Sequence, residues 1–382
     1  MEIAHSLQQI QSSYIREILA AASDKNVISL AGGLPDEKTF PIELMKPTLE
    51  NMANMAHVFQ YGATAGYGPL LEHLKVRFAL PESHDVMACT GSQQGLDLIA
   101  RAYINPGDVV VMEAPSYLGA MQVFGLVQAD IATVSQTAFG PDVTQLEEVF
   151  KTRQPKMFYA VPDFHNPTGV CWALDTRQQV ADLCERYNVA FIEDAPYREL
   201  RFRGDALPLV SDFCPQHSIV LRSFSKIASP GLRIGAVSGK KEYLAPLIKV
   251  KQGADLHSSV PMQALLLGLL EHDNFELHMK NIRQLYKSRY EVLHETLSAL
   301  LPDTCELKSI DGGMFVWLSI PQCDTFALAK TLLSNGVAVV PSPVFYPQPE
   351  GTPAALRLNF TNAEPKELTE AVRRLADVLN AL

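Results

Sequence analysis

SFSKIASPGLRIG, at residues 223–235, places hydroxyl groups and an arginine around a single lysine, Lys226. Short apolar runs lie on both sides of this stretch, Ile219 to Leu221 before it and Ile234 to Val237 after it. Continuous apolarity over about four residues is typical of a parallel strand that is covered on both faces. We therefore predict that Lys226 follows the end of one buried strand and precedes another.

The surroundings of Lys226 favour a reactive amine. Neighbouring groups that bind anions can lower the pKa of a lysine, and a neutral amine forms a Schiff base with a carbonyl. A single lysine after a strand is most often a solvated side chain, however. A catalytic role for Lys226 therefore depends on what the rest of the sequence offers.

An alternation of strands and helices extends upstream of this stretch. Three further apolar runs occur at Val109 to Met112, Phe158 to Val161 and Val189 to Ile192. They alternate with three segments of helical spacing, at Ser92 to Ile104, Tyr117 to Leu126 and Thr176 to Tyr187. This order predicts a doubly wound α/β domain, with a mostly parallel sheet covered by helices.

The pattern changes after Glu271. Between Phe275 and Leu300 apolar residues stand mostly three or four apart, which predicts a long helix leading away from the sheet. Apolar runs at 314–320, 337–340 and 356–360 predict strands, and helices are expected from Thr325 and Pro365. We therefore expect an N-terminal arm or lid helix at residues 1–30, a large domain at 31–272 and a small α+β domain at 273–382.

The composition narrows the function classes. The chain has 42 Asp and Glu residues against 32 Lys and Arg residues, so its formal net charge is −10. This charge repels phosphate backbones and anionic lipids, and we expect neither nucleic acid nor a membrane as partner. The six cysteines lack a metal-ligand spacing, which predicts reduced thiols and no metal site. Without a signal-type N-terminus or an apolar run of about 18 residues, the protein is expected to be cytoplasmic.

Three other predicted strand ends carry polar side chains. TGSQQG, at 90–95, stands where a strand ends and a helix begins, and its small residues let backbone N–H groups approach a phosphate. NPTG, at 166–169, follows the strand at 158–161, and IEDAPY, at 192–197, ends the next strand with an acid and a phenol. Seen alone, the first is an ordinary helix cap and the second an ordinary turn.

Together with Lys226, these segments form a consistent set. In open α/β sheets, ligands bind at the carboxyl ends of the strands. The set offers a phosphate cradle, the amide of Asn166, the acid Asp194 with the phenol Tyr197, and an amine. An aldehyde cofactor with a phosphate arm and a pyridine ring requires these groups. The cradle is neither GxxxxGK[ST] nor GxGxxG, so it lacks the fingerprints of nucleoside triphosphate and dinucleotide sites.

Over nearly its whole length the sequence resembles the class I and II aminotransferases, which are fold type I enzymes dependent on pyridoxal 5′-phosphate (PLP). The resemblance is greatest to the 2-aminoadipate, aromatic and multi-substrate subgroup. The motifs that carry it are Tyr61-Gly62 with Gly66, GSQQG at 91–95, Pro115-Ser116-Tyr117, NPTG at 166–169, DAPY at 194–197, SFSK at 223–226 with PGLRIG after it, and RLNF at 357–360. It implies a large PLP-binding domain and a smaller C-terminal domain.

The resemblance also implies roles for individual residues. Lys226 would be the Schiff-base lysine and would move the proton at the substrate α-carbon. Asp194 would pair with the protonated pyridine nitrogen. Asn166 and Tyr197 would bind the phenolic oxygen, and Tyr117 would stack on the ring.

The phosphate would be held at the other end of the cofactor. By resemblance, its ligands are Gly91, Ser92, Gln93, Ser223, Ser225 and Arg233. Tyr61 would reach the phosphate of the other protomer, which implies a homodimer with active sites at the interface.

Substrate recognition is assigned in the same way, to Arg357, Gly33, Asn166 and Arg16. Arg357 matches the family position for the substrate α-carboxylate, and the backbone of Gly33 would approach the same group. Arg16, in a candidate lid helix at 12–19, would receive a distal carboxylate, as in relatives that resemble 2-aminoadipate aminotransferases. His165 stands where many relatives of the subgroup carry glutamine, and we expect it to be a neutral hydrogen-bonding residue.

These assignments predict an aminotransferase that moves an amino group from an L-amino acid to a 2-oxo acid such as 2-oxoglutarate, with ping-pong kinetics. A PLP-dependent carbon–sulfur β-lyase would use the same cofactor residues and differ in the bond that breaks. A PLP-binding sensor like the aminotransferase-like half of certain transcription regulators is a third possibility. The net charge, and a cofactor domain that begins almost at Met1, argue against this sensor.

Overall fold

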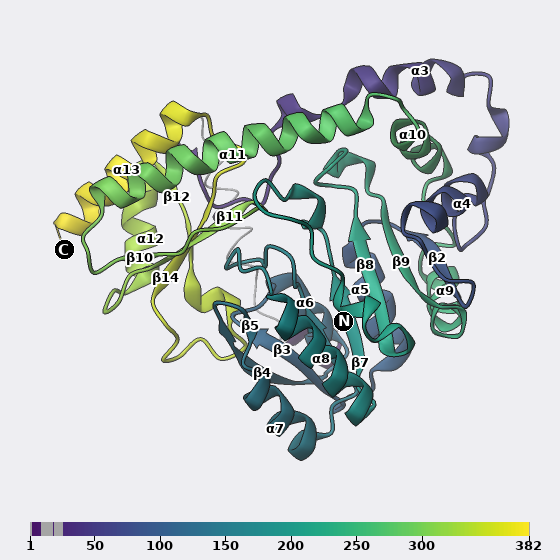
Figure 1. Ribbon diagram of the computed structural model, residues 1–382, viewed down its shortest axis with the longest axis horizontal. Helices are drawn as coiled ribbons and strands as arrows, with labels where there is room; N and C mark the ends of the chain where they lie inside the picture. Colours follow the sequence, from purple (N-terminus) through teal and green to yellow (C-terminus); the bar gives the residue numbers. More distant parts are fainter. Residues whose placement is uncertain (1, 9–17, 19–25, 382) are drawn as a thin grey trace.

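An eight-stranded mixed sheet forms the centre of the larger lobe in the computed structural model, which describes residues 2–8, 18 and 26–381 (Figure 1). Its order is β2-β9-β8-β7-β6-β3-β4-β5. The strands are β2 (His84–Cys89), β3 (Val109–Ala114), β4 (Asp130–Thr137), β5 (Gly140–Pro141), β6 (Met157–Ala160), β7 (Ala190–Asp194), β8 (Ser218–Ser223) and β9 (Gly235–Lys240). Strands β4, β3, β6, β7 and β8 run parallel, whereas β9 is antiparallel to both of its neighbours.

Helices cover both faces of this sheet. On one face pack α5 (Ser92–Tyr103), α6 (Leu118–Leu126) and α9 (Lys241–Ala254), and on the other pack α7 (Val143–Arg153) and α8 (Leu174–Tyr187). Successive side chains of a strand point to opposite faces. In β6, Tyr159 therefore joins the core on the α5 side, and Phe158 joins the core on the α8 side. This double burial explains why the central strands are continuous apolar runs.

A further group of helices lies beside β2 and β9 at the end of the sheet (Figure 1). It consists of α3 (Ile42–Met52), α4 (Gly68–Arg77) and α10 (Val260–Leu270). Near the N-terminus, α1 (His5–Gln8) is a single turn. From the end of this group α11 (Phe275–Leu300) runs across the molecule to the smaller lobe, where it packs against α13 (Pro365–Asn380) (Figure 1).

The smaller lobe contains a four-stranded antiparallel sheet in the order β10-β11-β14-β13. Its strands are β10 (Glu306–Leu307), β11 (Phe315–Ser319), β13 (Val340–Pro341) and β14 (Ala355–Asn359), and α12 (Thr325–Ser334) is its third helix. A two-stranded ladder pairs β1 (Ile28–Ser29) with β12 (Val337–Ala338). The extended segment near the N-terminus is thereby attached to the C-terminal part of the chain.

The predicted α/β architecture with a smaller α+β part is confirmed. The strand expected at 337–340 is divided, because β12 pairs with β1 and β13 pairs with β14, on either side of Val339. The lid helix expected at 12–19 falls mostly outside the described residues. The domain boundaries at 30 and 272 stay a prediction.

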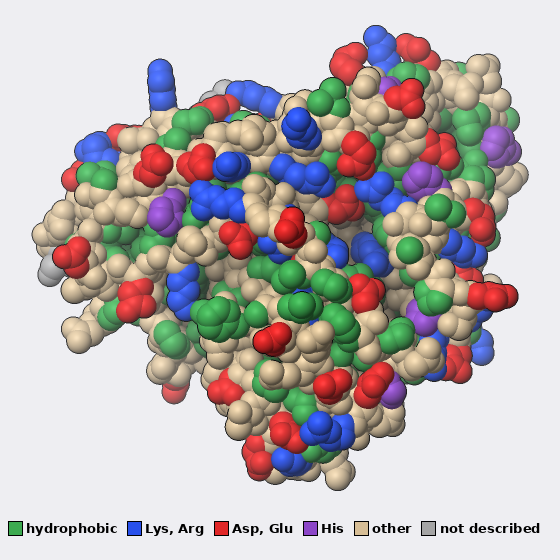
Figure 2. All heavy atoms as spheres, viewed as in Figure 1, with side chains coloured by type: hydrophobic (Ala, Val, Ile, Leu, Met, Phe, Trp, Pro, Cys, Tyr) green, Lys and Arg blue, Asp and Glu red, His purple; other side chains and the backbone are tan. Residues whose placement is uncertain are grey.

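The surface carries no separate patch of one charge on the face drawn in Figure 2, where acidic and basic side chains are interspersed. A continuous basic track, which a phosphate backbone requires, is not seen on this face. Within residues 2–8, 18 and 26–381, no helix combines the length and apolarity needed to cross a bilayer.

Candidate active site

A cavity of about 270 Å³ lies at the carboxyl ends of β6, β7 and β8, beside the N-terminus of α5. Thirteen of the predicted site residues line it together, namely Gly33, Gly91, Ser92, Gln93, Tyr117, Asn166, Asp194, Tyr197, Ser223, Ser225, Lys226, Arg233 and Arg357. Within the described part of the chain, no group of three or more His, Cys, Asp or Glu residues is arranged to hold a metal ion.

Lys226 stands in the turn that follows β8, and its Nζ donates a hydrogen bond to the carbonyl oxygen of Gly33 over 2.7 Å. Burial lowers the pKa of Lys226 to about 8, and the nearby charges of Arg233 and Arg357 act in the same direction. The neutral amine is therefore a minority form near physiological pH, but it is far more abundant than in an ordinary lysine, as a nucleophilic lysine requires.

Asp194 ends β7 and is buried at the floor of the cavity. Its Oδ2 accepts a hydrogen bond from the Tyr159 hydroxyl at 2.8 Å, whereas its Oδ1 has no partner within the described residues. Burial raises the pKa of Asp194 to about 7, although the Tyr159 hydrogen bond lowers it. A buried carboxylate with a free oxygen fits a protonated ring nitrogen, which would supply the missing donor and charge.

The opposite end of the cavity is suited to an anion. Gly91 has φ +75° and precedes the first residue of α5, Ser92. A Cβ on Gly91 would lie 2.6 Å from Nη2 of Arg233, so glycine is required for this close approach. Arg233 also donates from Nη2 to the carbonyl oxygen of Thr90 at 3.3 Å. Helix N–H groups and a guanidinium together form a cradle of the kind that binds phosphate.

Hydroxyl groups extend this cradle. Ser223 is the last residue of β8, and its Oγ accepts the backbone N–H of Ser225 at 3.3 Å in the turn that follows. Both serines line the cavity, and the backbone turns between them. Gln93 accepts a hydrogen bond from the Tyr117 hydroxyl at 3.1 Å, which holds that ring against the cavity.

Asn166 connects a phenol to an arginine. Its Nδ2 donates to the Tyr197 hydroxyl at 3.3 Å, and its Oδ1 accepts from Nη1 of Arg357 at 2.8 Å. Burial raises the pKa of Tyr197 well above its ordinary value, so the phenol stays a hydrogen-bond donor at neutral pH.

Arg357 belongs to β14 of the small sheet and reaches the cavity between two aromatic rings. Its guanidinium carbon lies 4.3 Å from the ring centre of Phe315 and 5.0 Å from that of Phe345. Nη2 donates to the carbonyl oxygen of Ala31, and Nε is buried with no partner in the described residues. Burial lowers the pKa of Arg357 to about 10, so it remains a cation at neutral pH. A buried cation that has no carboxylate partner among the described residues fits an anionic substrate group.

One predicted site residue that the structure describes, Tyr61, does not line this cavity. Tyr61 is 81% exposed and lies edge-on against His257, with ring centres 5.8 Å apart. Arg16 lies outside the described residues. The expected neutral state of His165 agrees with its environment, because burial lowers its pKa to about 3, and its Nδ1 lies 3.1 Å from Oγ1 of Thr168.

Three residues of the cavity wall were not predicted, namely Tyr159, Val161 and Pro196. Tyr159, in β6, and Val161, in the predicted strand at 158–161, are two positions apart, so side-chain alternation could have placed them on the cavity face. Nothing in the sequence signals that Phe315 and Phe345 enclose Arg357, because β11, β14 and the segment after β13 meet only in the folded small lobe.

The chain resembles known aminotransferases over nearly its whole length. Residues 25–375 match the family model for aminotransferase class I and II. The chain is 34% identical to an aromatic-amino-acid aminotransferase from Thermococcus litoralis, over 97% of this chain and 92% of that protein. It is 35% identical to a 2-aminoadipate transaminase from Thermus thermophilus, over 98% and 95%.

A solved aminotransferase structure has the same fold as this chain. The crystal structure of a kynurenine aminotransferase from Pyrococcus horikoshii, in complex with PMP, is 34% identical. It superimposes with a TM-score of 0.95 over 99% of this chain and 97% of that chain. The chain therefore belongs to the class I and II aminotransferases, and it is a transaminase with the fold type I architecture of PLP-dependent enzymes.

Proposed function

We propose that this chain transfers the amino group of an L-amino acid to a 2-oxo acid such as 2-oxoglutarate, with PLP bound in the cavity described above. The observation that carries the proposal is the convergence of Lys226, Asp194 and Arg357 on one cavity from two lobes of the molecule. An amine of lowered pKa, a carboxylate with a free oxygen and a buried guanidinium whose Nε has no partner in the described residues match the reacting amine, the ring nitrogen and the substrate carboxylate of this reaction.

The residues present fit the cofactor at both of its ends. The cradle at Gly91, Ser92 and Arg233 would hold the phosphate, and the free Oδ1 of Asp194 would bind the ring nitrogen. Tyr197, with Asn166 beside it, would bind the phenolic oxygen. When bound, PLP supplies an aldehyde that accepts the amino group and a ring that withdraws electrons from the substrate α-carbon.

The chain's own groups would then perform the proton transfer. Arg357 would bind the substrate carboxylate through two parallel hydrogen bonds and so fix the orientation of the α-carbon bond that breaks. Lys226 Nζ would take the proton from the substrate α-carbon and deliver it to the carbon that carries the aldehyde of free PLP, since its pKa of about 8 suits both steps near neutral pH. The apolar walls that enclose Arg357 would exclude water from this exchange.

A homodimer is part of this proposal. Tyr61 is 81% exposed, Phe59 is 66% exposed, and Arg233 at the edge of the cavity is also exposed. A second copy that covers this edge would bury the two aromatic side chains and bring the partner's Tyr61 toward the phosphate cradle. The free state of all six cysteines agrees with a reducing cytoplasmic location.

Relatives named for aromatic amino acids, 2-aminoadipate and kynurenine support donors with aromatic or long side chains. The test is a panel of single amino acids, each with 2-oxoglutarate as acceptor, followed by detection of glutamate. Formation of glutamate with several of these donors supports the proposal. Release of pyruvate and ammonia from a cysteine conjugate, in the absence of any 2-oxo acid and without glutamate formation elsewhere, would instead assign a carbon–sulfur β-lyase.

A further inference from the structure

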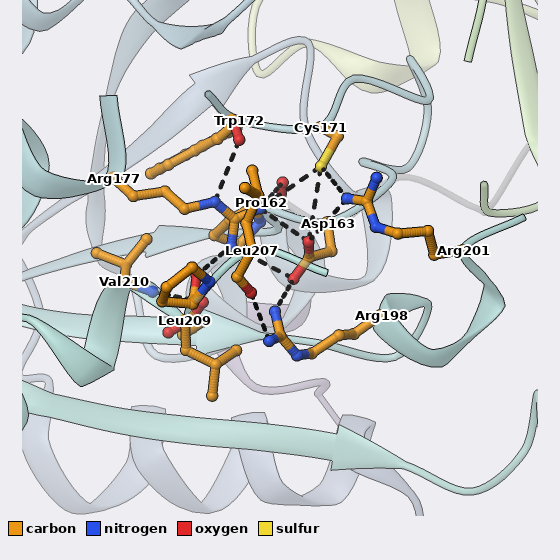
Figure 3. Close-up of polar contacts among 12 residues, drawn as sticks. Pro162, Asp163, Cys171, Trp172, Arg177, Arg198, Arg201, Leu207, Leu209 and Val210 are labelled. Atoms are coloured by element: carbon orange, nitrogen blue, oxygen red, sulfur yellow. Dashed lines mark hydrogen bonds and ion pairs between the residues drawn. The ribbon is translucent and has the colours of Figure 1, made fainter. Parts of the chain in front are cut away.

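The loop that carries Asn166 is closed at its base. It begins at Pro162, shortly after β6, and ends at Trp172, shortly before α8. The backbone N–H of Trp172 donates to the carbonyl oxygen of Pro162 at 2.8 Å. Arg177, in the first turns of α8, donates to both ends of the loop, to the Trp172 oxygen at 3.1 Å and to the Pro162 oxygen at 3.2 Å (Figure 3). The base of the loop is therefore fixed to α8 by a fully buried guanidinium.

Asp163 occupies the centre of this base and is 2% exposed. Its Oδ1 accepts from Nη2 of Arg177 at 2.8 Å, and its Oδ2 accepts from Nη1 of Arg198 at 2.9 Å (Figure 3). Burial alone would raise the pKa of Asp163, but the charges of Arg177 and Arg198 outweigh it and hold the pKa below its ordinary value. Asp163 is therefore ionised throughout the neutral range, and it forms charge-assisted bonds to two separate segments.

Arg198 directly follows Tyr197 and begins a short 3₁₀ helix, Arg198–Leu200. The chain after β7 contacts the loop after β6 through Arg201, which donates to Sγ of Cys171 at 3.0 Å, and through two contacts next to Asn166 and Tyr197. Outside the cavity they meet at the contact of Asp163 with Arg198, and inside it they meet where Asn166 donates to Tyr197 at 3.3 Å. The outer contact is the shorter of the two and is the charged one.

We propose that Asp163 is a positioning residue, which through Arg198 and Arg177 sets the separation of Asn166 and Tyr197. This inference rests on the proposed function, in which those two side chains bind the phenolic oxygen of PLP. A buried ion pair is poor support for fold stability, because desolvation of the charges offsets most of their attraction. Its geometric effect is direct, because Asp163 is three residues from Asn166 and Arg198 is next to Tyr197.

The experiment uses the holoenzyme of three variants, Asp163→Asn, Arg198→Gln and Arg198→Lys. The readout is the pH midpoint of the visible cofactor absorption, measured without substrate. Hydrogen bonds from Asn166 and Tyr197 stabilise the anionic phenolic oxygen, so their loss makes that oxygen hold its proton more tightly. We expect Asp163→Asn and Arg198→Gln to raise the midpoint by about one pH unit. We expect kcat to fall by up to about 100-fold, with a smaller change in KM.

Arg203→Gln is the matched control, because Arg203 lies on the same segment but pairs with Glu291 and does not contact Asp163. Arg203→Gln should keep the wild-type midpoint. Arg198→Lys keeps the positive charge, so its midpoint should lie closer to the wild-type value than that of Arg198→Gln. If Asp163→Asn fails to fold, the partly exposed Arg198 still provides the test.

A wild-type midpoint in Arg198→Gln or in folded Asp163→Asn would overturn the positioning role and leave the proposed function intact. The same shift in Arg203→Gln would overturn it as well. If the wild-type protein shows no visible cofactor band, the proposed function is wrong, and the inference that rests on it is wrong as well.

Discussion

Nη1 of Arg357 lies 2.8 Å from Oδ1 of Asn166, and this contact joins the small sheet to the loop that follows β6. The amide of Asn166 also donates to the Tyr197 hydroxyl. The guanidinium proposed to bind the substrate is thus oriented by the same amide that is proposed to contact the cofactor. Substrate binding and the environment of the phenolic oxygen are therefore coupled through one side chain.

Replacement of Arg357 by lysine should weaken substrate binding. A lysine keeps the charge but loses the planar pair of donors, so we expect KM for amino donors to rise about 10- to 100-fold. Steady-state kinetics would measure the effect. Arg222→Lys is the control, since Arg222 stacks on Phe78 and does not line the cavity. An unchanged KM in Arg357→Lys would contradict the assignment.

Asp194→Asn should separate catalysis from stability. The amide keeps the shape of the carboxylate but cannot compensate a protonated ring nitrogen, so we expect kcat to fall about 100- to 1,000-fold. Because burial raises the pKa of Asp194 to about 7, the charged carboxylate destabilises the cofactor-free fold at pH 8. The cofactor-free variant should therefore have a higher Tm than the wild type at that pH. A lower Tm together with an unchanged kcat would disprove both parts.

Glu113→Gln should change how stability depends on pH. Glu113 is fully buried, and burial raises its pKa from the ordinary 4.5 to about 8, although hydrogen bonds from Gln136 and Trp172 lower it. Because the folded-state pKa is the higher one, its contribution is complete below pH 4.5 and is lost as the pH rises to about 8. Thermal unfolding between pH 5 and 8 should show a smaller loss of Tm in the variant than in the wild type. Parallel Tm curves would show that Glu113 does not titrate in this range.

Tyr61→Phe tests the homodimer. If Tyr61 of one protomer binds the phosphate in the other, its loss should weaken PLP binding about tenfold, with little change in fold stability, because Tyr61 is exposed in the single chain. Equilibrium dialysis would measure cofactor affinity, and sedimentation would measure the assembly. Tyr187→Phe serves as the control, since that hydroxyl binds Glu147 on α7. A monomeric wild type that retains PLP would refute the shared site.

The parts of the site that could be predicted from the sequence are those in which local pattern and sheet geometry suffice. Asn166, Asp194 and Lys226 each follow or end a short apolar run, and parallel strands bring such positions to one edge. Gly91 could be predicted because a phosphate cradle at a helix N-terminus requires a small residue.

The contacts that could not be predicted connect segments far apart in the sequence. The enclosure of Arg357 by Phe315 and Phe345 depends on strand pairing within the small lobe, which no local periodicity specifies. The same holds for the pair of Asp163 with Arg198, because a charge pattern does not indicate which loops will meet. The antiparallel direction of β9 could not be predicted either, because an apolar run in the sequence does not indicate whether the strand runs parallel or antiparallel to its neighbours.

The most direct test of the central claim is the absorbance spectrum of the purified protein with PLP, recorded before and after single amino acids are added in the absence of any 2-oxo acid. We predict a visible cofactor band that changes with particular amino acids, and the loss of this conversion in Lys226→Ala. The absence of a band after incubation with PLP, or an undiminished conversion in Lys226→Ala, would contradict the account.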